Sequence, residues 1–179
     1  KNWCLEKKRL SNHVLINVDD CRALLPKYWK AIIISKIKTL QGDWINLFRQ
    51  ECQIIAEKIF HYALEHRMNI VWNGTGKNFQ KYNDILQLAK KNNYIIELRY
   101  IWVPIQVAKK RVHRRASIIG RIVPQHIIDL AEQKIPITFK KLLSSANYAR
   151  ILENTCTSPS IIWDKDQGWS SNTTPIFNF

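Results

Sequence analysis

A chain of 179 residues is long enough to bury a substantial core, and it has the size of a single domain. Its hydrophobic content of 46% excludes a disordered chain, and apolar runs such as residues 31–34 are far too short to cross a bilayer. The formal net charge of +14 indicates a polyanionic partner such as nucleic acid, nucleotides or an acidic protein, but a basic solvated surface explains it about equally well.

The first predicted elements are a helix end, a strand and a long helix. Residues 2–9 are typical of the end of a helix, and the apolar run HVLINV, residues 13–18, predicts a buried strand that ends in the pair Asp19–Asp20. Asp43 can cap a helix that runs to about His66, because apolar residues then recur every three or four positions. The predicted apolar face consists of Ile45, Phe48, Cys52, Ile55, Ile59 and Tyr62.

The second predicted strand, NIVW over residues 69–72, leads into the polar segment NGTGK. A P-loop needs a glycine, four further residues and then Gly-Lys-Ser/Thr, so that backbone amides curl around a phosphate. Val71 stands where the first glycine is required, and Asn78 follows Lys77, so this segment is not a P-loop. Its small residues would instead let another molecule approach the backbone at the end of a strand.

The rest of the chain continues the alternation of helices and strands. We expect helices over residues 82–92, 106–115 and 124–134, with an interruption at Pro136 before residues 139–143, and strands over residues 94–103, 149–154 and 160–165. The alternation predicts one α/β domain over residues 1–179, a three-layer sandwich with a mainly parallel sheet. Ligands bind beyond the carboxyl ends of such strands, so Asp19 and residues 73–75 are expected at one edge.

Several segments match a known family in order. LINVDDCRALLP, residues 15–26, has a strand that ends in an aspartate, followed by a basic residue and a proline. Residues 56–77 have a helix with a glutamate, then a strand that leads into NGTGK, where the family has Glu-Gly-Thr-Gly-Arg. GRIVP, residues 120–124, follows a basic helix, as the family's Ala/Gly-Arg-x-x-Pro segment does. From about residue 13 to about residue 155, the chain resembles the zeta toxins, P-loop small-molecule kinases of bacterial toxin–antitoxin systems.

The resemblance implies site residues. Asp19 would be the catalytic base that accepts the proton of the attacking hydroxyl, and Arg115 and Arg121 would neutralise charge near the triphosphate. The substrate would be bound by Arg22, Glu57, Asn73, Thr75 and Lys77. Asn73 replaces the family's glutamate, and Lys77 keeps the charge of an arginine without its planar fork. From the residues alone, Asp19 can also be a turn or cap residue, and Glu57 and the basic helix can be solvated charges.

The implied activity is transfer of the γ-phosphate of ATP to a hydroxyl of a small molecule, such as the nucleotide sugar UDP-N-acetylglucosamine. Mg²⁺ would bridge the phosphates with no assigned protein ligand, and an antitoxin protein is an implied partner. We expect the domain to be truncated at its N-terminus, with the P-loop and the central strand of the family's sheet upstream of Lys1. Without that strand the sheet would divide into two halves with open edges.

Two alternative functions remain open. A pseudokinase or binding protein would keep the P-loop kinase-like fold without catalysis, and Asn73 favours it. A nucleic-acid-binding module is favoured by the charge and by the seven tryptophans, although most of these fall in apolar runs. The four cysteines show no CxxC spacing and nothing at the N-terminus resembles a signal peptide, so we expect reduced thiols and a cytoplasmic protein without a membrane association.

Overall fold

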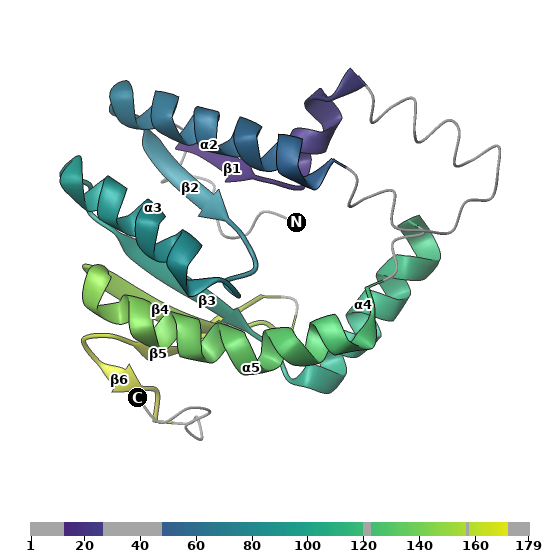
Figure 1. The fold of residues 1–179 in the computed structure, drawn as a ribbon. Helices are drawn as coiled ribbons and strands as arrows, with labels where there is room; N and C mark the ends of the chain where they lie inside the picture. Colours follow the sequence, from purple (N-terminus) through teal and green to yellow (C-terminus); the bar gives the residue numbers. More distant parts are fainter. Residues whose placement is uncertain (1–12, 27–47, 120–122, 157, 172–179) are drawn as a thin grey trace. The chain divides into compact units, whose positions relative to one another are not determined.

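The computed structural model of this chain describes residues 13–26, 48–119, 123–156 and 158–171 (Figure 1). The chain divides into two compact units, Lys1–Gly74 and Thr75–Phe179. The helix expected over residues 2–9, the cap Asp43 and the candidate Arg121 lie outside the described residues. That residues 1–179 form a single domain stays a prediction.

The first unit is built on a pair of parallel strands. β1 (His13–Asn17) pairs with β2 (Asn69–Asn73), and this register places Asn17 opposite Asn73. Both strands were predicted to within one residue. A short 3-10 helix, η1 (Asp20–Leu24), follows β1, and α2 (Arg49–Glu65) packs against both strands and against η1 (Figure 1).

The buried face of α2 differs from the predicted one. Tyr62 was expected on the apolar face, but it is 54% exposed, and its ring stacks on His66 with 3.9 Å between the centroids. Phe60 instead contacts Trp72 of β2 edge-on, with 5.5 Å between the centroids. The spacing of large apolar residues misplaced the face because alanines form much of it. The buried residues of α2 are Cys52, Ala56, Phe60, Ala63 and Leu64.

The second unit contains a four-stranded sheet in the order β3-β4-β5-β6. β3 and β4 are parallel, and β5 and β6 continue the sheet with antiparallel pairings. β6 was not predicted, because two residues are too few to show a period. The elements of this unit are α3 (Phe79–Lys91), β3 (Glu97–Trp102), α4 (Ile105–Ile119), α5 (Gln125–Leu142), η3 (Leu143–Ser145), β4 (Tyr148–Glu153), β5 (Ser160–Asp164) and β6 (Gly168–Trp169).

The predicted interruption at Pro136 is wrong, since α5 runs through it from Gln125 to Leu142. A proline removes one backbone donor from a helix and usually kinks or breaks it. Here the half of the helix beyond Pro136 is anchored by burial, because Phe139 packs with the sheet residues Ala149, Ile151, Ile162 and Trp163. Tertiary packing therefore outweighs the local preference of the proline.

The described strands form two separate sheets, β1-β2 and β3-β4-β5-β6. The prediction that the sheet divides into two parts is therefore confirmed for the described residues. The proposed cause, a central strand encoded upstream of Lys1, stays a prediction.

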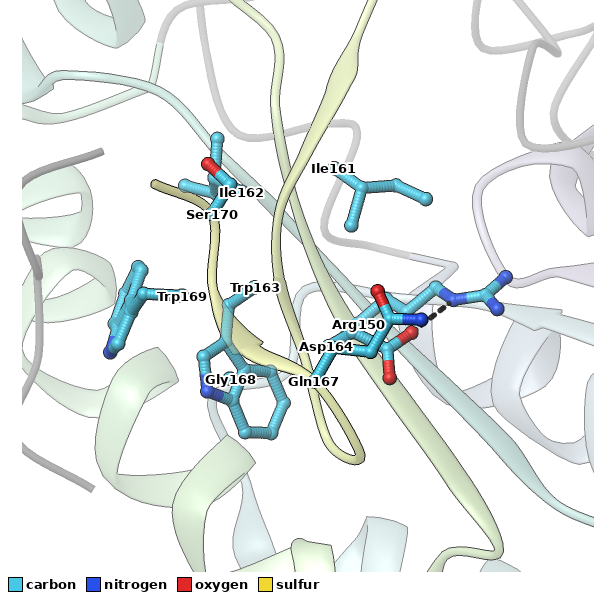
Figure 2. A pocket seen from close by; sticks show the side chains of 9 residues that line it. All are labelled: Arg150, Ile161, Ile162, Trp163, Asp164, Gln167, Gly168, Trp169 and Ser170. Carbon is cyan, nitrogen blue, oxygen red and sulfur yellow. Dashed lines mark hydrogen bonds and ion pairs between the residues drawn. The ribbon is translucent and has the colours of Figure 1, made fainter. Parts of the chain in front are cut away.

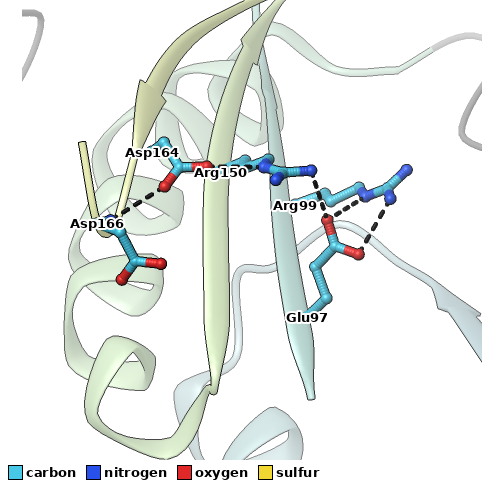
Figure 3. Close-up of polar contacts among 5 residues, drawn as sticks. All are labelled: Glu97, Arg99, Arg150, Asp164 and Asp166. Atoms are coloured by element: carbon cyan, nitrogen blue, oxygen red, sulfur yellow. Dashed lines mark hydrogen bonds and ion pairs between the residues drawn. The ribbon is translucent and has the colours of Figure 1, made fainter. Parts of the chain in front are cut away.

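A chain of charged side chains crosses three strands of the larger sheet (Figure 3). Arg150 of β4 donates from Nε to Asp164 of β5 at 2.7 Å, and its Nη1 lies 3.6 Å from Glu97 of β3. Glu97 also accepts from Arg99 Nε at 2.8 Å. The Arg150 guanidinium holds the pKa of Asp164 below its usual range. This network joins a parallel and an antiparallel pairing on one face of the sheet.

Tyr100 gives the fold an expected sensitivity to alkali. Burial, together with the Glu132 carboxylate, raises the pKa of Tyr100 from 10.0 to about 12. Because the folded pKa is the higher one, the stability that this phenol contributes is complete below pH 10 and is lost as the pH rises towards 12. We expect Tyr100→Phe to lose less stability than the wild type between about pH 10 and 12 in denaturant titrations. Tyr148→Phe, at an exposed tyrosine, is the control, and equal losses in all three proteins would contradict the prediction.

Candidate functional site

Asp19 lies in the turn directly after β1, at the carboxyl edge of the β1–β2 pair. The Oδ1 atom of Asn17 accepts a hydrogen bond from the backbone N–H of Asp19 at 3.0 Å. This Asx turn fixes the backbone that presents the exposed Asp19 carboxylate. Asn73, the last residue of β2, lies at the same edge, as the sequence predicted. Sequence reasoning overlooked Asn17, although an asparagine two residues before Asp19 is the usual signal of such a turn.

The two other predicted residues of this unit lie on its helices. Arg22 is part of η1, which packs against α2, and Glu57 is exposed on α2. Gln53 Nε2 donates to Glu57 Oε1 at 3.0 Å along the same helix. Beneath the turn, Cys21 is buried, and burial raises the pKa of its thiol, with smaller contributions from Cys52 and Asp20. The segment that follows the Asp19 turn is therefore anchored by a buried side chain and by packing against α2.

The segment from Thr75 to Asn78, which we call the elbow, opens the second unit. Gly76 has φ +74°, in the left-handed region that favours glycine, and its N–H donates to the Tyr82 hydroxyl at 3.1 Å. Asn78 caps α3 by accepting from Lys81 N at 3.2 Å, so α3 begins three residues earlier than predicted. Thr75 is exposed on this elbow and Lys77 is half-buried. No sequence pattern signals the bond to Tyr82.

Helix α4 carries Arg115 and a group of further cations without an acidic residue. Lys109 pairs with Asp129 of α5 at 3.2 Å. The hydrogen bond from Gln125 and, after it, the one from Lys109 lower the pKa of the Asp129 carboxyl. Arg111 donates to the Thr155 carbonyl at 3.3 Å. Arg115 is exposed, and it makes no ion pair with any carboxylate of the described residues.

Comparison with known proteins decides the family. The family model described as Zeta toxin matches residues 4–166. The chain belongs to the zeta toxin family. No curated protein matches it. A solved chain from the PezAT chromosomal toxin–antitoxin system of the human pathogen Streptococcus pneumoniae has the same fold, with a TM-score of 0.70 and 17% sequence identity. That match covers 90% of this chain and 64% of the Streptococcus chain.

In this zeta toxin chain the predicted site residues fall into two sets. Asp19, Arg22, Glu57 and Asn73 belong to the first unit, and Thr75, Lys77 and Arg115 belong to the second. The structure brings Asp19 and Asn73 to one edge of a parallel pair. That both sets contact one ligand stays a prediction.

Across the described ranges, no group of three or more His, Cys, Asp or Glu side chains could hold a metal ion. Cys21, Cys52 and Cys156 are free thiols. In the described part of the chain, no helix combines the length and the apolar character that a bilayer crossing requires.

A separate hollow of about 420 Å³ lies on the β5–β6 hairpin (Figure 2). It contains none of the predicted site residues, and the Arg150–Asp164 ion pair already occupies part of its polar lining. We therefore assign it no part in the activity. Its lining residues are Arg150, Ile161, Ile162, Trp163, Asp164, Gln167, Gly168, Trp169 and Ser170.

Proposed function

We propose that this protein is an ATP-dependent kinase that transfers the γ-phosphate to a hydroxyl of a small molecule in the cytoplasm. The observation that carries the proposal is the turn after β1, where Asn17 fixes the backbone of Asp19 beside the end of β2. An exposed carboxylate on a fixed turn can accept the proton of a substrate hydroxyl within hydrogen-bond reach. Family membership supports the same role for Asp19.

The residues of the site fit a phosphorylated donor and an anionic acceptor. Phosphoryl transfer is catalysed mainly by positioning and by neutralising charge, and α4 offers an exposed arginine, Arg115, on a helix without acidic residues. Mg²⁺ typically takes one or two carboxylates and otherwise phosphates and water, so the phosphates of the substrates would supply most of its ligands. When bound, Mg²⁺ neutralises charge on the phosphates.

We propose a nucleotide sugar such as UDP-N-acetylglucosamine as the acceptor. Its diphosphate is negatively charged, and Asn73, at the end of β2, adds no negative charge of its own. Lys77, four residues further on, adds a positive charge. These two residues favour an anionic acceptor over a neutral sugar.

The test uses the complete protein, including any residues that are encoded upstream of Lys1. We expect acceptor-dependent formation of ADP and a product heavier by one phosphoryl group, measured by mass spectrometry. A panel of nucleotide sugars, free sugars and nucleosides identifies the acceptor. Binding of ATP and acceptor without turnover would reject the kinase and establish the pseudokinase.

We also propose a partner protein. The solved neighbour belongs to a toxin–antitoxin system, and we propose that an antitoxin protein binds this chain and blocks its activity. Co-expression with a candidate antitoxin from the same organism should give a stable complex that has lost kinase activity. Separate elution of the two proteins would reject this partner.

The exposed cations of α4 also favour a second candidate function, binding of nucleic acid. If α4 binds along a DNA backbone, the binding constant should fall as salt is added. A plot of its logarithm against the logarithm of the salt concentration should then have a slope of about −0.9 for each phosphate contacted. We expect instead weak binding with a shallow slope, measured by fluorescence anisotropy with duplex and single-stranded DNA. Tight binding with a slope of several units would favour the nucleic-acid function over the kinase.

A further inference from the structure

We propose that Tyr82 is a positioning residue that shapes the elbow for the acceptor through its hydroxyl group. This inference rests on the proposed function, because it assigns the acceptor to Thr75 and Lys77. Tyr82 is placed by the first turn of α3, where its own backbone N–H donates to the Asn78 carbonyl at 3.3 Å. The cap by Asn78 therefore sets the register at which the Tyr82 ring meets the elbow.

The hydroxyl satisfies a donor that no regular element uses. Gly76 precedes α3, so its N–H has no place in the hydrogen bonds of that helix, and the Tyr82 hydroxyl accepts it at 3.1 Å in a half-buried setting. A half-buried backbone N–H without an acceptor is costly, so this bond selects one conformation of the elbow. The bond spans six residues, so it links the elbow to the first turn of α3.

A second element also contacts the elbow. A Cβ atom on Gly76 would lie 3.5 Å from Cγ2 of Ile135 on α5, so the glycine backbone already lies against that side chain. α3 and α5 pack together, and Gly76 is near a side chain of each, the Tyr82 hydroxyl and Ile135. The positive φ of +74° at Gly76 is therefore fixed by a hydrogen bond from one helix and by packing against another.

The position of this peptide determines where its neighbours project. Thr75 and Lys77 flank Gly76, so rotation of either peptide at Gly76 swings the two side chains that are proposed to hold the acceptor. With the hydroxyl removed, the elbow would sample further conformations, and binding of the acceptor would have to order it again. Binding of ATP does not depend on the elbow and should not change.

The experiment compares Tyr82→Phe with the wild type in the complete protein. Tyr148→Phe, at an exposed tyrosine of β4, is the matched control. We expect KM for the acceptor to rise by about 3- to 10-fold in Tyr82→Phe, the range that one neutral hydrogen bond supplies. KM for ATP should stay close to the wild-type value, and Tm should fall by no more than a few degrees, since only one hydrogen bond is lost. Tyr148→Phe should change neither KM.

A second readout is independent of activity. Amide hydrogen exchange measured by NMR should show Gly76 N–H protected in the wild type and in Tyr148→Phe, and faster by a similar factor in Tyr82→Phe. Unchanged Gly76 exchange, or equal shifts of both KM values, overturns the proposal. If the wild type transfers no phosphate, the proposed function fails, and the exchange measurement alone then decides whether Tyr82 fixes the elbow.

Discussion

Replacement of Asp19 by asparagine is expected to lower kcat for phosphoryl transfer by about 10²–10⁴-fold, the range that a positioned general base contributes. The amide of Asn keeps the size of the side chain but cannot accept the hydroxyl proton. Folding should be preserved, because the hydrogen bond to Asn17 uses the backbone N–H of Asp19 and not its side chain. The measurement is single-turnover transfer to the acceptor, with circular dichroism and Tm as checks of folding.

Asp20→Asn is the matched control for this prediction. Asp20 is also exposed, in the first turn of η1, and its substitution removes the same charge one residue further along the chain. We expect its kcat to stay within a few-fold of the wild type. If Asp20→Asn and Asp19→Asn lose activity equally, the effect is one of local charge, and Asp19 is not the base. Wild-type activity in Asp19→Asn would remove it from the mechanism altogether.

The carboxyl edge of the first sheet could be predicted because its signals are local. The apolar run of β1 ends abruptly in acidic residues, and β2 ends in a polar segment, so the alternation with α2 predicts a parallel pair. Parallel pairing then brings Asn17 opposite Asn73, and Asp19 follows at the same edge. The strand pattern alone was enough to predict that Asp19 and Asn73 lie at one edge.

The features that sequence patterns missed depend on contacts between elements. The bond from Gly76 to Tyr82 joins the elbow to the first turn of α3, and no spacing in the sequence encodes it. The continuity of α5 through Pro136 depends on Phe139 packing against the sheet, and local propensity cannot show this. The exposure of Tyr62 was missed for a similar reason. The buried face of α2 includes alanines, which a pattern of large apolar residues does not reveal.

Replacement of Arg115 is expected to have the other large effect, and it separates the kinase from the pseudokinase. A well-placed arginine can contribute about 10³–10⁵ in rate to phosphoryl transfer. Arg115 lies exposed on α4 without an ion pair to a described carboxylate, so none of these groups weakens its attraction to phosphate. We expect Arg115→Met to lose at least about 10³-fold in kcat, measured at saturating ATP.

The decisive comparison is between Arg115→Lys and Arg114→Lys. Lysine keeps the charge at either position but loses the planar fork that binds two phosphate oxygens at once. If Arg115 binds the transferring phosphoryl group, Arg115→Lys should lose most of what Arg115→Met loses. Arg114, its exposed neighbour on α4, should tolerate lysine with little change. If both lysine variants turn over at the wild-type rate, α4 contributes only general positive charge. Catalysis must then rest on other residues, and Arg121 is the next arginine to test.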